Sequence, residues 1–138
     1  MRIRSFRVPF SRVVPNDAHE VEYGPGDYMV VRPLFGLPAG EAQEWAERIA
    51  DVRRRALEAS DSDDPKKVEK AGDALDALVV AMIDALVVEW NLEAPDGSRI
   101  AKPEKPADLA VLPLALRHGL FPFMQSYRGD APDPTTSS

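Results

Sequence analysis

The sequence predicts an α+β fold in which a small N-terminal antiparallel β element packs against a mainly α-helical bundle. Short runs of alternating apolar and polar residues within 1–35 have the period of strands. Residues 36–127 contain long stretches in which apolar residues recur every three or four positions, the period of helices. We expect a single domain over 1–127. Residues 128–138 carry almost no apolar side chains, which predicts a flexible C-terminal tail.

The β element is predicted from three short segments. Residues 1–14 alternate between apolar and basic or polar side chains, which favours a half-buried strand. Pro9 has no backbone N–H, so this strand is an edge strand or is interrupted there. Residues 19–23 and 28–34 predict two further strands, and the turns between the three segments suggest a small antiparallel meander.

The central element is a helix predicted from Asp64 to Leu92. Pro65 suits the first helical position, and Asp63 or Asp64 can cap the free N–H groups before it. One face repeats apolar residues at helical spacing, and the apolar arc widens toward the C-terminus. We therefore expect the C-terminal half of this helix to be covered on two sides.

Other helical segments flank the central one. Apolar residues spaced as on a helix predict a first helix over 41–59, followed by an acidic linker. A short helix is expected over 107–116, interrupted or restarted around Pro113. The apolar cluster that follows contains Pro122, which we expect to limit regular helix there.

Composition excludes several classes of protein. The 138 residues are 44% apolar and 29% charged and include no cysteine, so the chain is typical of a globular protein without disulfides or thiolate metal sites. The net charge of −6 argues against non-specific nucleic-acid binding. No secretory signal is visible, and no apolar run approaches the length of a membrane span. We expect a soluble, cytoplasmic protein.

The N-terminus is basic although the whole chain is acidic. Arg2, Arg4, Arg7 and Arg12 occur in the first twelve residues without an acidic residue among them. Two interpretations remain open. The segment is either an arm that lies against an acidic protein surface or a solvated strand with arginines on its outer face.

Candidate catalytic and metal-binding residues are scarce. His19 and His118 lie far apart in sequence, and neither has a companion at metal-binding spacing. The acidic linker 61–64 resembles the start of a calcium loop, but Pro65 occupies its fifth position and Gly72 stands where the bidentate glutamate belongs. We predict no catalytic residue, no metal site and no cofactor.

The remaining candidates for function are apolar surface residues, because the chain has more aromatic area than its short elements need for internal packing. Aromatic side chains often anchor protein interfaces. The residues that we predict to contact a partner are Tyr28, Val30, Phe35, Phe121 and Phe123.

Several motifs resemble those of a known family. Residues 87–97 (VVEWNLEAPDG), continued by Lys102-Pro103 and by residues 109–114 with their Leu112-Pro113 step, resemble the tail assembly chaperones of long-tailed phages and prophages. Residues 26–33 (GDYMVVRP) resemble the strand before the first helix in those proteins. The basic N-terminal arm and the phenylalanine-rich segment 119–124 depart from the family pattern.

The resemblance implies a non-enzymatic protein that binds tail-tube or tape-measure subunits in the host cytoplasm before they polymerise. It brings no catalytic residue, and self-association stays open. Two alternatives remain. One is a structural virion component, such as a neck, tail or capsid-associated protein, and the other is a small metal-dependent enzyme that uses Asp73, Asp76 and Asp84 or the acidic linker.

Overall fold

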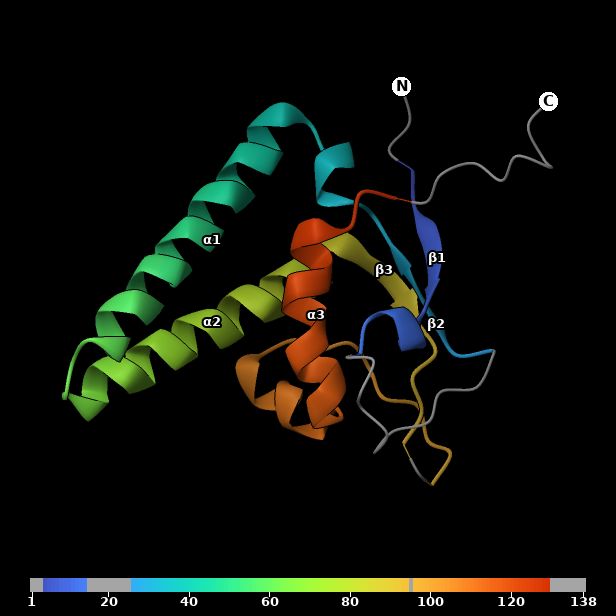
Figure 1. Cartoon of the computed structure of the whole chain (residues 1–138). Helices are drawn as coiled ribbons and strands as arrows, with labels where there is room; N and C mark the ends of the chain where they lie inside the picture. Colours follow the sequence, from blue (N-terminus) through green and yellow to red (C-terminus); the bar gives the residue numbers. More distant parts are fainter. Residues whose placement is uncertain (1–3, 15–25, 95, 130–138) are drawn as a thin grey trace.

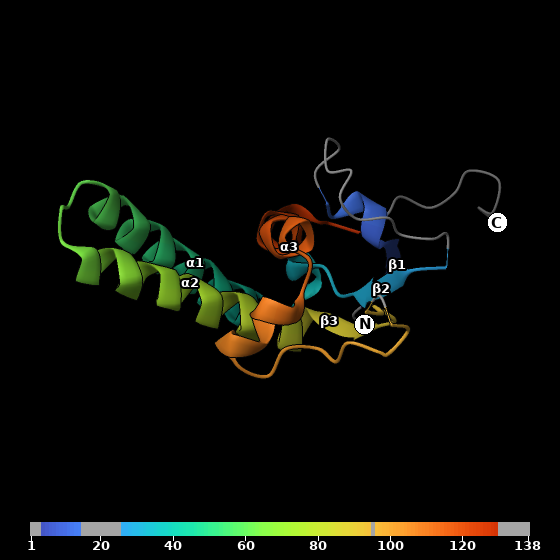
Figure 2. The same cartoon turned by 90° about the horizontal axis from the view of Figure 1, so that it is seen from below.

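The computed structural model describes residues 4–14, 26–94 and 96–129. This part of the chain contains an antiparallel sheet and a long helical hairpin that points away from it (Figure 1; Figure 2). The strands are β1 (Phe6–Pro9), β2 (Tyr28–Val31) and β3 (Val87–Trp90), and the α-helices are α1 (Ala39–Ser60), α2 (Pro65–Leu86) and α3 (Leu114–Ser126). Short 3-10 helices cover Phe10–Arg12, Leu34–Gly36 and Pro106–Val111. The predicted α+β fold class is confirmed.

The sheet has the order β1-β2-β3, with β1 at one edge. Strand β1 ends at Pro9 and a 3-10 helix follows, so the predicted strand over 1–14 is too long, while the expectation of an edge strand is confirmed. Strand β2 likewise stops at Val31, before the predicted end at residue 34. The predicted strand over 19–23 lies outside the described residues, and β3 pairs with the other side of β2.

The largest error of the sequence prediction concerns the end of the central helix. Helix α2 stops at Leu86, and Val87 has the extended backbone angles φ −94° and ψ 110°. Residues Val87–Trp90 form β3, where Trp90 pairs with Met29. Two consecutive valines favour a strand, and pairing with β2 satisfies their backbone groups. Trp90 also continues the helical spacing from Leu86, so periodicity alone did not separate the two elements.

The core lies between the sheet, α2 and α3. In the C-terminal half of α2, Leu78, Met82, Ile83 and Leu86 are at most 2% exposed. Helix α1 packs along one side of α2, while α3 and the 3-10 helix Pro106–Val111 pack on others. The expectation that this half is covered on two sides is confirmed. Its start is also as predicted, because Asp64 Oδ1 accepts a hydrogen bond from the Lys66 N–H over 3.0 Å.

The helix predicted over 107–116 is divided, as expected, around Pro113: Pro106–Val111 is a 3-10 helix, and α3 begins at Leu114 and runs beyond the predicted end. Helix α3 passes very close to the N-terminal segment. It continues through Pro122, so the expectation that this proline limits regular helix is wrong. Leu120 and Met124 are almost fully buried on either side of the proline, and their packing offsets the lost backbone hydrogen bond. At Gly119, a Cβ atom would lie 2.0 Å from the carbonyl oxygen of Val13, so this approach requires glycine.

The segment after β3 is tied back to the sheet. The Trp90 indole N–H donates to the Ile100 carbonyl over 2.8 Å. Asn91 accepts a hydrogen bond from the Tyr28 N–H at 2.7 Å and donates to the Gly26 carbonyl at 2.6 Å. The Trp-Asn pair of the family-like motif therefore connects the end of β3 to both neighbouring segments.

The start of the predicted tail packs against the body. The Arg128 guanidinium lies 4.2 Å from the centre of the Phe35 ring, and a Cβ atom at Gly129 would lie 2.8 Å from the Phe6 ring. Residues 130–138 lie outside the described part. Among the helices that are described, none has both the length and the apolar character needed to cross a bilayer.

Candidate functional site

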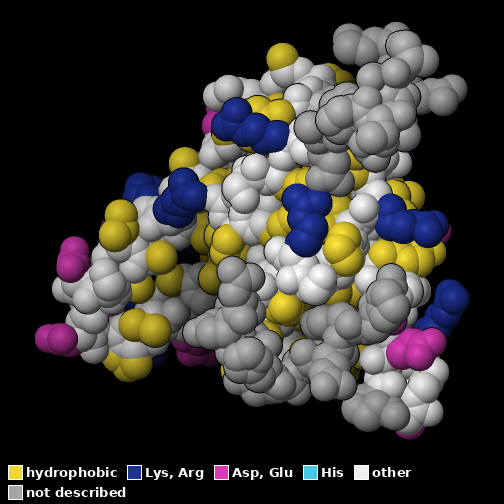
Figure 3. Space-filling view, turned by 45° about the vertical axis from the view of Figure 1, so that its right-hand side comes forward, with side chains coloured by type: hydrophobic (Ala, Val, Ile, Leu, Met, Phe, Trp, Pro, Cys, Tyr) yellow, Lys and Arg dark blue, Asp and Glu magenta, His cyan; other side chains and the backbone are white. Residues whose placement is uncertain are grey.

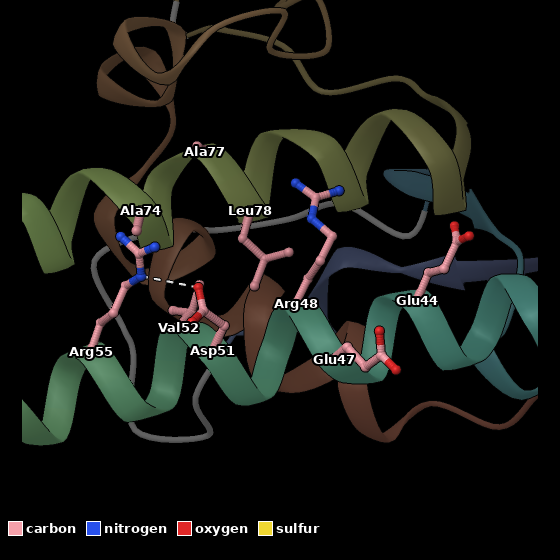
Figure 4. Close-up of a pocket in the computed structure, with 9 residues that line it drawn as sticks. All are labelled: Glu44, Glu47, Arg48, Asp51, Val52, Arg55, Ala74, Ala77 and Leu78. Carbon is pink, nitrogen blue, oxygen red and sulfur yellow. Dashed lines mark hydrogen bonds and ion pairs between the residues drawn. The ribbon is translucent and has the colours of Figure 1, made fainter.

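Two grooves run along the seam between α1 and α2, one on each side of the hairpin. The first, drawn in Figure 4, is lined by Glu44, Glu47, Arg48, Asp51, Val52, Arg55, Ala74, Ala77 and Leu78. The second, which we call the apolar groove, is lined by Val52, Arg53, Ala56, Ala59, Ser60, Val68, Ala71, Gly72, Leu75 and Phe121. Their chemistry differs sharply.

In the first groove, which we call the charged groove, Asp51 and Arg55 belong to a set of ion pairs on α1. Asp51 contacts Arg54 at 2.6 Å and Arg55 at 3.0 Å, and Arg54 also contacts Glu58 at 2.9 Å. The hydrogen bond from Arg54, with help from Arg55, holds the pKa of Asp51 below its usual value. Hydrogen bonds to Asp51 and Glu58 raise the pKa of Arg54. These groups are exposed and follow helical spacing, so they mainly support α1 itself.

The apolar groove contains one charged residue, Arg53. Its volume is about 400 Å³, and its other lining side chains are apolar apart from Ser60. Val68 is 54% exposed, and nothing lies within 4 Å of the position that a Cβ atom would take at Gly72. Figure 3 shows hydrophobic side chains along the hairpin, with basic side chains at its upper edge. The groove remains open because α3 covers only the half of the hairpin next to the sheet (Figure 1). Phe121 of α3 lines the groove at that side.

A further hollow, distinct from the two grooves, adjoins the apolar groove on the same side of α1. It has a volume of about 760 Å³ and shares Arg53 with the apolar groove. Its lining residues are Leu34, Phe35, Ala46, Ile49, Ala50, Arg53, Pro122, Gln125, Ser126 and Arg128. We call the apolar groove and this hollow together the α1 strip. Among the described residues that line it, Arg53 and Arg128 are the charged ones, and none is a carboxylate.

The five residues predicted to contact a partner lie in different places. Phe35, which is 60% exposed, and the half-buried Phe121 line the α1 strip. Tyr28 and Val30 lie half-buried on β2, with the Arg7 guanidinium 4.1 Å from the centre of the Tyr28 ring. Phe123 stacks on Tyr127 with ring centroids 4.8 Å apart. The five residues therefore lie at three places: two line the α1 strip, two lie on β2, and Phe123 packs on Tyr127.

The described arginines of the N-terminal segment contact aromatic rings of the same chain. The guanidinium carbons of Arg4, Arg7 and Arg12 lie 5.6, 4.1 and 5.4 Å from the ring centres of Phe6, Tyr28 and Tyr127. Contacts of this kind stabilise a folded chain by about 0.5–1 kcal/mol at exposed sites. Of the two interpretations of this segment, these contacts favour the strand with outward arginines. Arg2 lies outside the described residues.

The acidic candidates for a metal site are separated or already paired. Asp76 contacts Arg117 at 2.8 Å, and Asp64 caps α2. Within the described ranges, no three histidine, aspartate or glutamate residues are grouped so as to hold a metal ion. The lowered pKa of Asp96 results from hydrogen bonds with Ser98 in a turn.

Sequence reasoning missed most of the α1 strip. Val52, Ala56 and Leu75 fit the apolar spacing of their helices, and that spacing did not mark them as residues that contact a partner. A signal was present, because both 22-residue helices keep apolar residues in the half next to their connecting turn. In the described part of the chain, the one further α-helix has 13 residues, which is too short to cover that half as well.

Comparison with protein-family models, curated proteins and solved structures finds no match for this chain.

Proposed function

We propose that this chain is a non-enzymatic assembly chaperone of phage or prophage tails. It would bind tail-tube or tape-measure subunits in the host cytoplasm and shield their mating surfaces until polymerisation. The observation that carries the proposal is the apolar groove between α1 and α2, where Val68 is 54% exposed and lies with exposed Gly72 and the half-buried Ala71 and Leu75. Surfaces of this kind on soluble proteins are typical of protein-binding sites.

The shape of the hairpin supports the proposal. Helices α1 and α2 extend about 33 Å, and their outer half lies beyond the sheet and α3 (Figure 2). A projecting hairpin reaches a partner's surface while the sheet and α3 remain packed. The resemblance of residues 87–97 to tail assembly chaperones supplies the class of partner.

The test is co-expression with the products of the neighbouring genes, among which the proposal expects tail-tube and tape-measure proteins, followed by affinity capture. We expect one of them to be captured and to stay soluble at concentrations where it otherwise polymerises, as followed by light scattering. Failure to bind either protein would remove the proposal.

The alternative of a structural virion component has its own readout. Mass spectrometry of purified particles should find this chain absent if it is a chaperone, because it leaves before assembly is complete. If the chain is present in stoichiometric amount, it is a structural subunit and the chaperone proposal is wrong. The alternative of a metal-dependent enzyme predicts a higher melting temperature in millimolar Mg²⁺, Mn²⁺ or Ca²⁺, because a ligand that binds only the folded state stabilises it.

A further inference from the structure

From the α1 strip we infer that the partner segment is an amphipathic α-helix whose apolar stripe is flanked by acidic side chains. This inference rests on the proposed function and specifies which chemistry the binding surface recognises. It follows from the charge, the length and the backbone of the strip.

Charge gives the first argument. The whole chain carries a net charge of −6, yet Arg53 and Arg128 are the charged residues that line the strip. Within the described residues, neither guanidinium has a carboxylate within 4 Å, whereas Arg54 and Arg55 on the opposite side of α1 both pair with Asp51. Arg53 donates to Gln125, and Arg128 lies over Phe35, so both are held on the strip with donors left for a partner's carboxylates.

The form of the backbone gives the second argument. The floor of the groove consists of two helices whose N–H and C=O groups are bonded within each helix. An extended segment laid on this floor would leave its own backbone groups without partners on an apolar surface. A helix bonds its backbone internally and presents side chains alone, which is the helix-in-groove mode of recognition.

Size gives the third argument. The lining residues of the strip on α1 run from Ala46 to Ser60, which corresponds to about 21 Å, or about four turns of a partner helix. Small residues line it at Ala50, Ala56 and Gly72, so a partner backbone can approach closely. A partner helix lying here would bring its apolar stripe to Val68 and Leu75, with its flanks near Arg53 and Arg128.

The experiment uses two synthetic helical peptides of about 18 residues with the same Leu/Ala stripe. One carries glutamates and the other lysines beside the stripe, and a scrambled glutamate peptide controls for charge alone. Binding to the full chain is measured by fluorescence anisotropy at low and high salt. We expect the glutamate peptide to bind at least about tenfold more tightly than the other two, and to weaken as salt screens the charges.

Matched variants locate the binding. Gly72→Glu places a carboxylate in the apolar groove, whereas Ala77→Glu places the same charge on the same helix in the opposite groove. Both sites are exposed, and thermal melts verify folding. We expect Gly72→Glu to abolish binding of the glutamate peptide and Ala77→Glu to leave it unchanged. The double variant Arg53→Glu, Arg128→Glu should invert the preference toward the lysine peptide.

Each contrary result has a distinct meaning. Equal affinity for the glutamate and lysine peptides, or no binding of either, would overturn the acidic-helix inference. The proposed function would survive that result if tail-subunit capture were lost in Gly72→Glu and kept in the double arginine variant. If sedimentation showed a dimer that Gly72→Glu dissociates, the occupant would be a second copy of this chain, and the inference would be wrong. Loss of both peptide binding and tail-subunit capture would remove both proposals.

Discussion

Two glycines inside helices provide an internal test of the packing. Gly72 of α2 faces open space, since nothing lies within 4 Å of a Cβ atom built there. Replacing it with alanine removes the conformational freedom of glycine without a clash, and we expect the free energy of unfolding to rise by about 0.5–1 kcal/mol. At Gly119 of α3, the added Cβ would lie 2.0 Å from the carbonyl oxygen and 2.9 Å from the carbonyl carbon of Val13.

Because both of these atoms belong to the backbone, Gly119→Ala must displace α3 or the segment around Val13. Overpacking of this kind costs about 1–3 kcal/mol, which exceeds the gain of up to about 1 kcal/mol in helix propensity. We expect the free energy of unfolding to fall by about 1–2 kcal/mol, measured by urea denaturation with circular dichroism. The same substitution at the two sites should therefore change stability in opposite directions. If Gly119→Ala were as stable as the wild type, α3 would not pass Val13 as closely as described.

Three further substitutions test other parts of the account. Asn91→Ala removes both side-chain bonds to the segment at the start of β2, and the free energy of unfolding should fall by about 1–3 kcal/mol; a neutral result in urea denaturation would contradict those bonds. Trp90→Phe leaves the Ile100 carbonyl without its indole donor and should lower the free energy of unfolding by about 1–3 kcal/mol. Trp90→Leu serves as the comparison, because it removes the aromatic ring as well as the donor. Asp51→Asn should be slightly less stable than the wild type at neutral pH. Because the folded-state pKa of Asp51 is lowered, its stabilisation is present above the ordinary aspartate pKa and is lost as the pH falls through the folded-state value. Melting curves of wild type and Asp51→Asn should therefore converge in acid, and a difference that persisted there would rule out the ion pairs as its source.

Periodicity predicted the long helices well because their patterns are long and regular. The observed α1 begins two residues before the predicted start at residue 41, and α2 begins at Pro65 beside its predicted cap. The pattern failed where a helix passes directly into a strand, since Trp90 fits both the helical spacing and the pairing with β2. The separate expectation from proline failed at Pro122, where burial of Leu120 and Met124 outweighs the local preference of proline.

The candidate site was harder to predict than the fold, because the sequence distinguishes apolar from polar faces but does not tell which apolar faces remain uncovered. Phe35 and Phe121 were identified as surface candidates from their aromatic character. Val68 and Leu75 follow the same helical spacing as the core residues of α2. How much of each stays exposed depends on the length and direction of α3, which are properties of the assembled fold.

The most direct test of the central claim is capture of the co-expressed tail-tube and tape-measure proteins by wild type, Gly72→Glu and Ala77→Glu. The account predicts that wild type and Ala77→Glu capture the same subunit equally, and that Gly72→Glu, although folded, captures none. Equal capture by all three proteins would show that the groove between α1 and α2 is not the binding surface.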